Sequence, residues 1–343
     1  MAQGHGALVS VVDEPTPIIA APSTPPVEAL RGRRRSLPKV TALVVVLIAE
    51  LITFAILAPE FLSRSNFLNV LTAISVTGIV AMPGTLLIVA GQFDLSVASI
   101  TALTGVAMAT AAESHSLAVG ILVAFAVGVA AGLANGFLVT VVGVNALITT
   151  LGMLSVLSGL ARVIADGLSV PVAGFSTLGT ARLVGIPLPV LVFLAVVLAF
   201  SFLGRFTTFG RSVYAIGSNP KAARLAGIRT KQIVVGLFVL SGVACALAGL
   251  ILTSMLGSAS PIAATGLELS VVTAIVLGGT TLSGGEGTVF GTLIGLLIVG
   301  FLNNGLIIKG VDPFWQYVAQ GALLIGAVSF DRLRLRLSRA RGE

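Results

Sequence analysis

The sequence has few of the residues from which enzymes build active sites and soluble proteins build surfaces. Only 10% of the 343 residues are charged, whereas about 25% is usual in a soluble domain. The single cysteine, Cys245, excludes an internal disulfide and a metal cluster built on cysteine pairs. Neither paired carboxylates nor a Ser-His-Asp set accompanies the two histidines, His5 and His115. We therefore expect no catalytic residue, no metal site and no cofactor.

Apolar residues take the place of the missing charge. They make up 56% of the chain, the mean hydropathy is +1.08, and a soluble fold of this length could not cover so much apolar surface. The 40 glycines are scattered through the apolar runs, where small residues let transmembrane helices approach closely. The composition predicts an all-α, polytopic membrane protein.

Ten apolar runs have about the length needed to cross a bilayer. The weakest boundaries follow Gly91 and surround Gly284-Gly285, where Gly and polar residues suggest broken or re-entrant helices. We predict a disordered cytoplasmic tail at 1–37, a transmembrane domain at 38–331 and a basic cytoplasmic tail at 332–343. Because the first run is longer than the apolar part of a signal peptide, we expect it to stay uncleaved. The predicted spans are 40–58, 67–90, 95–113, 117–141, 146–164, 183–203, 232–256, 268–282, 287–308 and 313–330.

The basic residues predict how the chain is oriented. Short cytoplasmic loops of membrane proteins carry an excess of Lys and Arg. With the N-terminus inside, ten spans place sixteen of the 20 Lys and Arg residues on the cytoplasmic side. These residues fall in three patches separated by apolar spans, which argues against nucleic-acid binding. We expect a multi-pass membrane protein with both termini in the cytoplasm.

An internal repeat is visible in two pairs of short sequence words. An acid followed by Leu-Ser-Val occurs at Asp94 and again at Glu268, 174 positions later. A second pair, around Asn135 and around Asn303-Asn304, lies at nearly the same offset. A repeat of five helices must cross the membrane in the opposite sense, because five is odd. We therefore predict two inverted five-helix repeats, an arrangement typical of alternating-access transporters.

The longest polar stretch between spans is the loop at 205–232, which contains six basic and no acidic residues. Ser218-Asn219-Pro220 is typical of a helix start and Gly227 of a stop, so a short helix is expected from Pro220 to Ala226. Its Ala222, Ala223 and Leu225 would form a small face suited to a groove on a partner protein. The alternative is a basic loop that lies on anionic lipid headgroups.

A series of short words runs along most of the chain. In order they are Asp94-Leu95-Ser96-Val97, Asn135-Gly136, Thr150-Leu151-Gly152, Thr208 with Gly210-Arg211, Ala215-Ile216-Gly217, Asn219 with Ala222-Ala223-Arg224, Gly227-Ile228, Gly266 with Glu268-Leu269, Gly278-Gly279-Thr280, Leu282 with Gly284-Gly285 and Gly287-Thr288, and Asn304-Gly305-Leu306. By the order and spacing of these words, rather than by any one of them, the sequence from about residue 60 to 330 resembles the ribose/xylose/arabinose-type permease family of bacterial ABC importers. Gln92, Asn145 and Ser158 depart from the family's usual residues.

The resemblance implies a transport subunit of the bacterial cytoplasmic membrane rather than an enzyme. It implies that two permease subunits pair, as a homodimer or a heterodimer, that an ABC ATPase binds from the cytoplasm, and that an extracytoplasmic binding protein delivers a monosaccharide or similar polyol. The sequence contains no G-x-x-x-x-G-K-[ST] phosphate loop, so ATP hydrolysis belongs to a partner chain. The residues implied to couple to the ATPase are Arg211, Gly217, Ser218, Asn219, Ala222, Ala223, Arg224, Gly227 and Ile228.

Polar residues inside the predicted spans are candidates for the translocation pathway. An ionised group near a helix centre costs about 2.5 to 3.5 kcal/mol, so Glu50, Asp94 and Glu268 need a reason for their position. Each could instead stabilise a helix end or a helix contact. Neutral candidates offer donors and acceptors to a polar solute, with interhelical hydrogen bonding as the alternative. The neutral candidates are Ser96, Asn135, Asn303, Asn304 and Gln316.

Three other functions stay open at this point. A secondary transporter would use the three intramembrane acids as coupling groups. An ABC permease for nucleosides or branched-chain amino acids would share the architecture, although the Asp-Leu-Ser-Val word favours a sugar. A membrane anchor without transport activity is the third.

Overall fold

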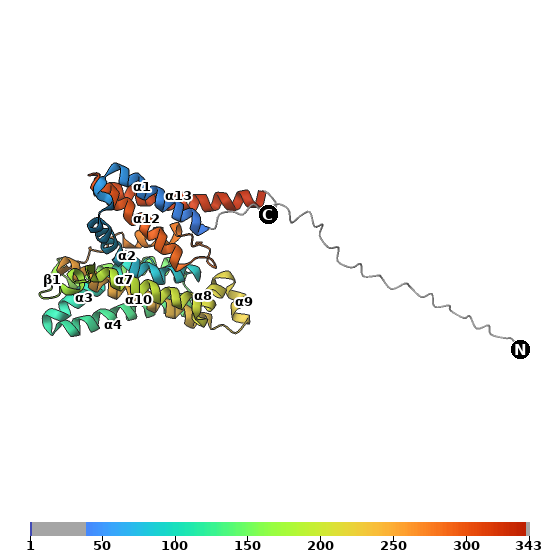
Figure 1. Cartoon of the computed structure of the whole chain (residues 1–343). Helices are drawn as coiled ribbons and strands as arrows, with labels where there is room; N and C mark the ends of the chain where they lie inside the picture. The colour runs from blue at the N-terminus through green and yellow to red at the C-terminus, as the bar shows by residue number, and fades with distance from the viewer. Residues whose placement is uncertain (2–38, 341–343) are drawn as a thin grey trace. The chain divides into compact units, whose positions relative to one another are not determined.

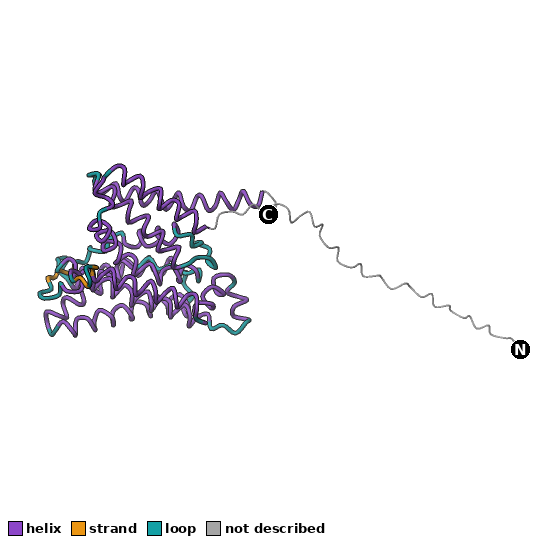
Figure 2. The backbone as a smooth tube through the Cα atoms, viewed as in Figure 1, coloured by secondary structure: helices purple, strands orange, loops and turns teal. Residues whose placement is uncertain are grey.

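The computed structural model describes Met1 and residues 39–340. The predicted tail at 1–37 therefore lies, apart from Met1, outside the described residues, as do the last three residues of the basic tail. From Lys39 onward the chain is a bundle of helices with four very short strands (Figures 1 and 2). The helices are α1 (Lys39–Leu57), η2 (Pro59–Leu62), α2 (Arg64–Val89), α3 (Val97–Ser114), α4 (Leu117–Phe137) with the π-helical turn η3 (Leu138–Val142), α5 (Ala146–Ile164), α6 (Thr177–Thr180), α7 (Leu188–Phe206), α8 (Thr208–Ser218), α9 (Pro220–Leu225), α10 (Thr230–Leu256), α11 (Leu267–Leu277), α12 (Val289–Ile308) and α13 (Pro313–Ala340).

A helix occupies each of the ten predicted ranges, and seven of the described helices are long and apolar enough to cross a membrane. The seven are α2, α3, α4 with η3, α5, α7, α10 and α12. The apolar part of α1, Thr41–Leu57, and α11 are shorter. The chain is therefore a multi-pass membrane protein.

Two predicted boundaries are breaks in the helical structure. Residues 90–96 separate α2 from α3, and residues 278–288 separate α11 from α12. In the second break Gly284 and Gly285 have φ values of 82° and 81°, a conformation that glycine adopts without steric cost. Because of this break α11 ends at Leu277, five residues before the end of the predicted span. The helix α8 was not predicted.

The middle of the bundle is formed by α2, α3 and α10, because α10 packs on both α2 and α3. Helix α4 packs closely on α3 and α10, while α12 packs on α2 and α11. The crossing of α4 and α10 depends on glycine, since a Cβ at Gly128 would overlap the carbonyl oxygen of Gly242, and one at Gly242 would overlap that of Gly128. Small residues thus allow the close helix approach expected from the composition.

The short strands lie at one end of the bundle, and α8 and α9 lie at the other (Figures 1 and 2). Strand β1 (Val170–Pro171) pairs antiparallel with β4 (Ser258–Ala259), and β2 (Arg182–Leu183) pairs with β3 (Ile186–Pro187). The start of α1 and the C-terminal end of α13 lie at the same end as α9 (Figure 1). The basic segments that the structure describes are thus gathered at the end opposite the strands.

Candidate functional site

The predicted short helix of the basic loop is confirmed as α9. The Asn219 side chain caps its N-terminus by accepting hydrogen bonds from the backbone amides of Lys221 at 3.1 Å and Ala222 at 3.0 Å. Pro220 occupies the first turn, where its missing N–H costs nothing. Gly227, with φ 82°, ends the segment. The capping makes a helix of only six residues well defined.

The predicted face of α9 is wrong in one respect. Ala223 is 4% exposed and packs in the core with Val89, Leu237 and neighbouring residues, so it cannot lie in a groove of a partner. Ala222 and Arg224 are exposed, and Leu225 is 91% exposed. The free surface of α9 is therefore a large apolar side chain among basic ones. A helix of six residues is too short for its sequence to show which side chains face the bundle.

Helix α8 connects α9 to the end of α2 and to the break between α11 and α12. The Tyr214 hydroxyl donates a 2.7 Å hydrogen bond to the Gly287 carbonyl oxygen, in the break between α11 and α12. Burial raises the pKa of Tyr214, so the phenol stays protonated and keeps this donor. Ser218 Oγ donates to the Tyr214 carbonyl oxygen at 2.9 Å, and Arg211 stays exposed.

Three backbone segments meet at the last turn of α8, where Gly217 contacts Gly285 and Val89. The Gly285 amide donates to the Val89 carbonyl oxygen at 2.8 Å. A Cβ at Gly217 would overlap that oxygen and crowd the Gly285 nitrogen, so only glycine permits the approach. Gly217 thus faces the bundle, and Ile228 is partly buried against the core cluster that contains Val89. We call Gly217, Gly285 and Val89 the glycine junction.

Asp94 lies in the break between α2 and α3 and holds it to α10. Its Oδ1 accepts hydrogen bonds from the backbone amide of Ser96 at 3.1 Å and from Ser96 Oγ at 2.6 Å. Its Oδ2 accepts one from Ser241 Oγ on α10 at 2.9 Å. Asn135 Nδ2 on α4 donates to Ser96 Oγ at 2.8 Å. The break, α4 and α10 are therefore joined through the side chains of Asp94 and Ser96. The sequence analysis missed Ser241.

The structure gives the other predicted pathway residues separate neighbours. Asn304 exchanges hydrogen bonds with Asn66 at 2.8 and 2.9 Å, joining α12 to α2. Within the part of the chain that the structure describes, Asn303 Oδ1, Glu268 Oε2 and both carboxyl oxygens of Glu50 are buried without a hydrogen-bond partner. Glu268, the counterpart of Asp94 in the predicted repeat, thus lacks the hydrogen bonds that hold Asp94.

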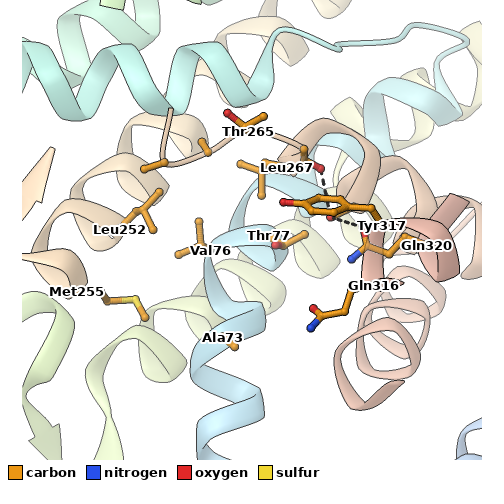
Figure 3. A pocket seen from close by; sticks show the side chains of 14 residues that line it. Ala73, Val76, Thr77, Leu252, Met255, Thr265, Leu267, Gln316, Tyr317 and Gln320 are labelled. Atoms are coloured by element: carbon orange, nitrogen blue, oxygen red, sulfur yellow. Dashed lines mark hydrogen bonds between the residues drawn. The ribbon is translucent and has the colours of Figure 1, made fainter. Parts of the chain in front are cut away.

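A cavity of about 310 Å³ opens between α2, the end of α10, the loop at 257–266, α11 and α13 (Figure 3). Gln316, a predicted pathway residue, lines it, and so does Gln320, one helical turn further along α13. Ser270 Oγ donates to Gln320 Oε1 at 3.1 Å. Thr77, Ser270, Tyr317 and Gln320 were not predicted, although the spacing of four between Gln316 and Gln320 places both on one helix face.

Comparison with known proteins places these features in a family. The family described as "Branched-chain amino acid transport system / permease component" matches residues 66–328. The chain belongs to this permease family. The L-arabinose transport system permease protein AraH of Escherichia coli (strain K12) is 40% identical over 300 residues, which cover 87% of this chain and 92% of AraH.

Two ribose permeases are similarly close to this permease. The ribose import permease protein RbsC of Escherichia coli (strain K12) is 40% identical over 83% of this chain and 92% of RbsC. RbsC of Bacillus subtilis (strain 168) is 40% identical over 82% of this chain and 89% of RbsC. No solved structure matches the chain. The resemblance to monosaccharide permeases is confirmed.

Proposed function

We propose that this permease is the membrane-spanning subunit of an ABC importer for a monosaccharide or similar small polyol, with the ATPase and the extracytoplasmic receptor on separate chains. The observation that carries the proposal is the geometry of α8 and α9. These helices present the exposed Leu225 among basic side chains. They also contact the end of α2 at Val89 and the break between α11 and α12 at Gly287. The names of the relatives AraH and RbsC favour a pentose.

The proposed topology has ten spans, with both termini in the cytoplasm of a bacterium. It is supported by the position of α8, α9 and the C-terminal end of α13 at one end of the bundle (Figure 1), since that end carries most of the basic residues. The strands and the loop at 257–266 then face the exterior, where a receptor would dock.

The proposed inverted repeat is supported by the pattern of helix contacts. The offset between the two copies makes α2, α3, α4 and α5 the counterparts of α10, α11, α12 and α13. Helix α3 contacts α4, α5 and α10, and α11 contacts α12, α13 and α2; likewise α4 contacts α10 as α12 contacts α2. The contacts of α1 and α7 do not correspond in this way, because α1 packs on α12, whereas α7 packs mainly on α2, so this support covers four of the five pairs.

The proposed mechanism transmits movement of the ATPase through rigid contacts. When α9 moves with its partner, α8 must follow, because Asn219 joins the two helices directly. The glycine junction and the bond from Tyr214 to Gly287 leave little room for α8 to slide past α2. The end of α2 and the two breaks therefore move as one unit, and the helices rock about the pathway.

Secondary transport is the weaker alternative, because it needs ionisable groups that are free to exchange protons or ions. Among Glu50, Asp94 and Glu268, Asp94 makes the most hydrogen bonds in the described structure. Its two oxygens accept three hydrogen bonds that hold a helix break in place. That arrangement suits a structural role. We assign Asp94, Ser96 and Asn135 to fixing the break and Asn304 to joining α12 to α2.

Leu225→Asp tests the assignment of α9 to ATPase binding. Leu225 is 91% exposed, so the change should leave folding and insertion intact while placing a charge in a desolvated contact. We expect recovery of the ATPase with the tagged permease to fall at least about tenfold, since an unpaired buried charge costs several kcal/mol. Arg224→Glu should act in the same direction.

The matched control is Leu168→Asp, because Leu168 is 71% exposed at the opposite end. It should leave ATPase recovery unchanged. Normal recovery with Leu225→Asp and Arg224→Glu together would place the ATPase contact elsewhere. Ala223→Asp is unsuitable for this test because Ala223 lies in the core.

A further inference from the structure

The cavity between α2, α10, α11 and α13 lies toward the end that carries the strands. Its wall includes Leu252 and Met255, near the end of α10, and Ala263 to Thr265 of the following loop. Since α10 runs from the basic end to the strand end (Figure 1), the proposed topology places this cavity on the exterior side. A solute released by an external receptor would reach it first.

The polar side chains of the cavity are all amides or hydroxyls. Its wall, as far as the structure describes it, contains no Asp, Glu, Lys, Arg or His. Glutamine and hydroxyl side chains both donate and accept hydrogen bonds, as sugar hydroxyls do. The polar side chains are Thr77, Thr265, Ser270, Gln316, Tyr317 and Gln320.

Several of these groups have no partner in the described part of the protein. Thr72 and Thr85 of α2 donate to the carbonyl oxygen four residues back, but the Thr77 hydroxyl makes no hydrogen bond there, and neither does the Gln316 amide. In Figure 3 Thr77 projects from α2 toward the space that Gln316 and Gln320 reach from α13. The two sides of the cavity thus offer unused hydrogen-bonding groups to the same volume.

The remaining wall is apolar and includes Val76, Leu252 and Leu267, and the ring of Tyr317 adds to it (Figure 3). Small-molecule sites combine such a lining with a few polar groups and usually measure about 300 to 1,000 Å³. At about 310 Å³ the cavity is at the lower end of that range. A zwitterionic amino acid would lose the solvation of two charges here without gaining a partner of opposite charge. A neutral polyol has no charge to desolvate, and its hydroxyls can exchange water for the amides and hydroxyls of the cavity.

We infer that this cavity is an external binding site for a neutral, polyhydroxylated solute, held by Thr77 on α2 and, across the cavity, by Gln316 and Gln320 on α13 with Ser270 beside them on α11. The inference rests on the proposed function and adds the place where the solute binds and the reason a charged solute is refused. It makes the permease a selective element in addition to its receptor.

Cysteine protection tests the site directly. The one natural cysteine, Cys245, is buried, so Ser270→Cys adds a thiol with little background. A membrane-impermeant thiol reagent should label Ser270→Cys, and L-arabinose, D-ribose or another member of a panel of neutral pentoses, hexoses and alditols should slow labelling several-fold. L-Leucine at the same concentration should not. Thr265→Cys provides a second reporter if Ser270→Cys does not fold.

The control is Ser114→Cys, because Ser114 is exposed near the end of α3 and lies outside the cavity. It should be labelled equally with and without sugar. Absence of protection by every sugar and alditol, or equal protection by L-leucine, contradicts the inference. ATP-driven uptake by the same variants, reconstituted with the ATPase and the receptor, reports on the proposed function separately, because protection needs neither partner.

Removing the amides tests which residues hold the solute. Gln316→Leu and Gln320→Leu should each raise the sugar concentration for half-protection, by up to about tenfold for the loss of one or two hydrogen bonds. Gln232→Leu is the matched control, since Gln232 is exposed at the start of α10, away from the cavity. Unchanged half-protection in both cavity variants would exclude these side chains from the site.

Discussion

Single polar side chains in this permease tie together helices that cross the membrane. The carboxylate of Asp94 accepts hydrogen bonds from Ser96 and from Ser241 on α10, and Asn135 extends the network to α4. In a bilayer a break such as residues 90–96 is tolerated only where its polar groups are satisfied within the protein. In this break one side chain, that of Asp94, accepts three of these hydrogen bonds.

Asp94→Ala should therefore lower stability and uptake together. Its removal leaves the hydroxyls of Ser96 and Ser241 without their acceptor, which costs about 1 to 3 kcal/mol per buried group. Asp94→Asn, which keeps one acceptor oxygen, should have a smaller effect, and Ser155→Ala, at an exposed position of α5, none. Thermal unfolding in detergent and sugar uptake check this. Full thermal stability of Asp94→Ala with uptake abolished would instead assign Asp94 to the transport step.

At the scale of whole elements, the connection between α8 and α2 rests on backbones that touch. Gly217→Ala adds one methyl group that overlaps the Val89 carbonyl oxygen. Alanine favours a helix by about 1 kcal/mol over glycine, so any loss of stability reports the packing at the glycine junction.

We expect Gly217→Ala to cost about 1 to 3 kcal/mol, as overpacking usually does, and to uncouple ATP hydrolysis from uptake. Gly152→Ala on α5 is the control, because a Cβ there meets nothing within 4 Å. The measurement is the ratio of sugar transported to ATP hydrolysed. An unchanged ratio and unchanged melting would show that α8 is not coupled through the glycine junction.

The sequence was informative where one local signal decides the structure. The Ser-Asn-Pro start and Gly227 stop predicted α9, and glycines predicted the breaks at 90–96 and 278–288. Helix α8 was missed because Thr208 to Ser218 was interpreted as part of a polar loop, although Phe209, Val213 and Ile216 lie at helical spacing. The burial of Ala223, the bond from Ser241 to Asp94 and the cavity depend on elements far apart in the chain, and no local pattern reports them.

At the scale of the whole molecule, long helices join two ends of different character. The basic end carries α8 and α9, and the strand end carries the loop at 257–266 and the cavity (Figures 1 and 3). Binding energy at one end can drive a change at the other only if the elements between have two discrete arrangements. The related contacts of α3 and α11 with their neighbours supply two similar units that could rock against each other.

The most direct test of the central claim is uptake by proteoliposomes that contain the permease with an ABC ATPase subunit and a sugar-binding receptor encoded beside it. We expect L-arabinose, D-ribose or a related polyol to accumulate only when ATP, the ATPase and the receptor are all present, and we expect Leu225→Asp to abolish this uptake. Uptake that persists without the ATPase and follows an imposed proton gradient would contradict the claim.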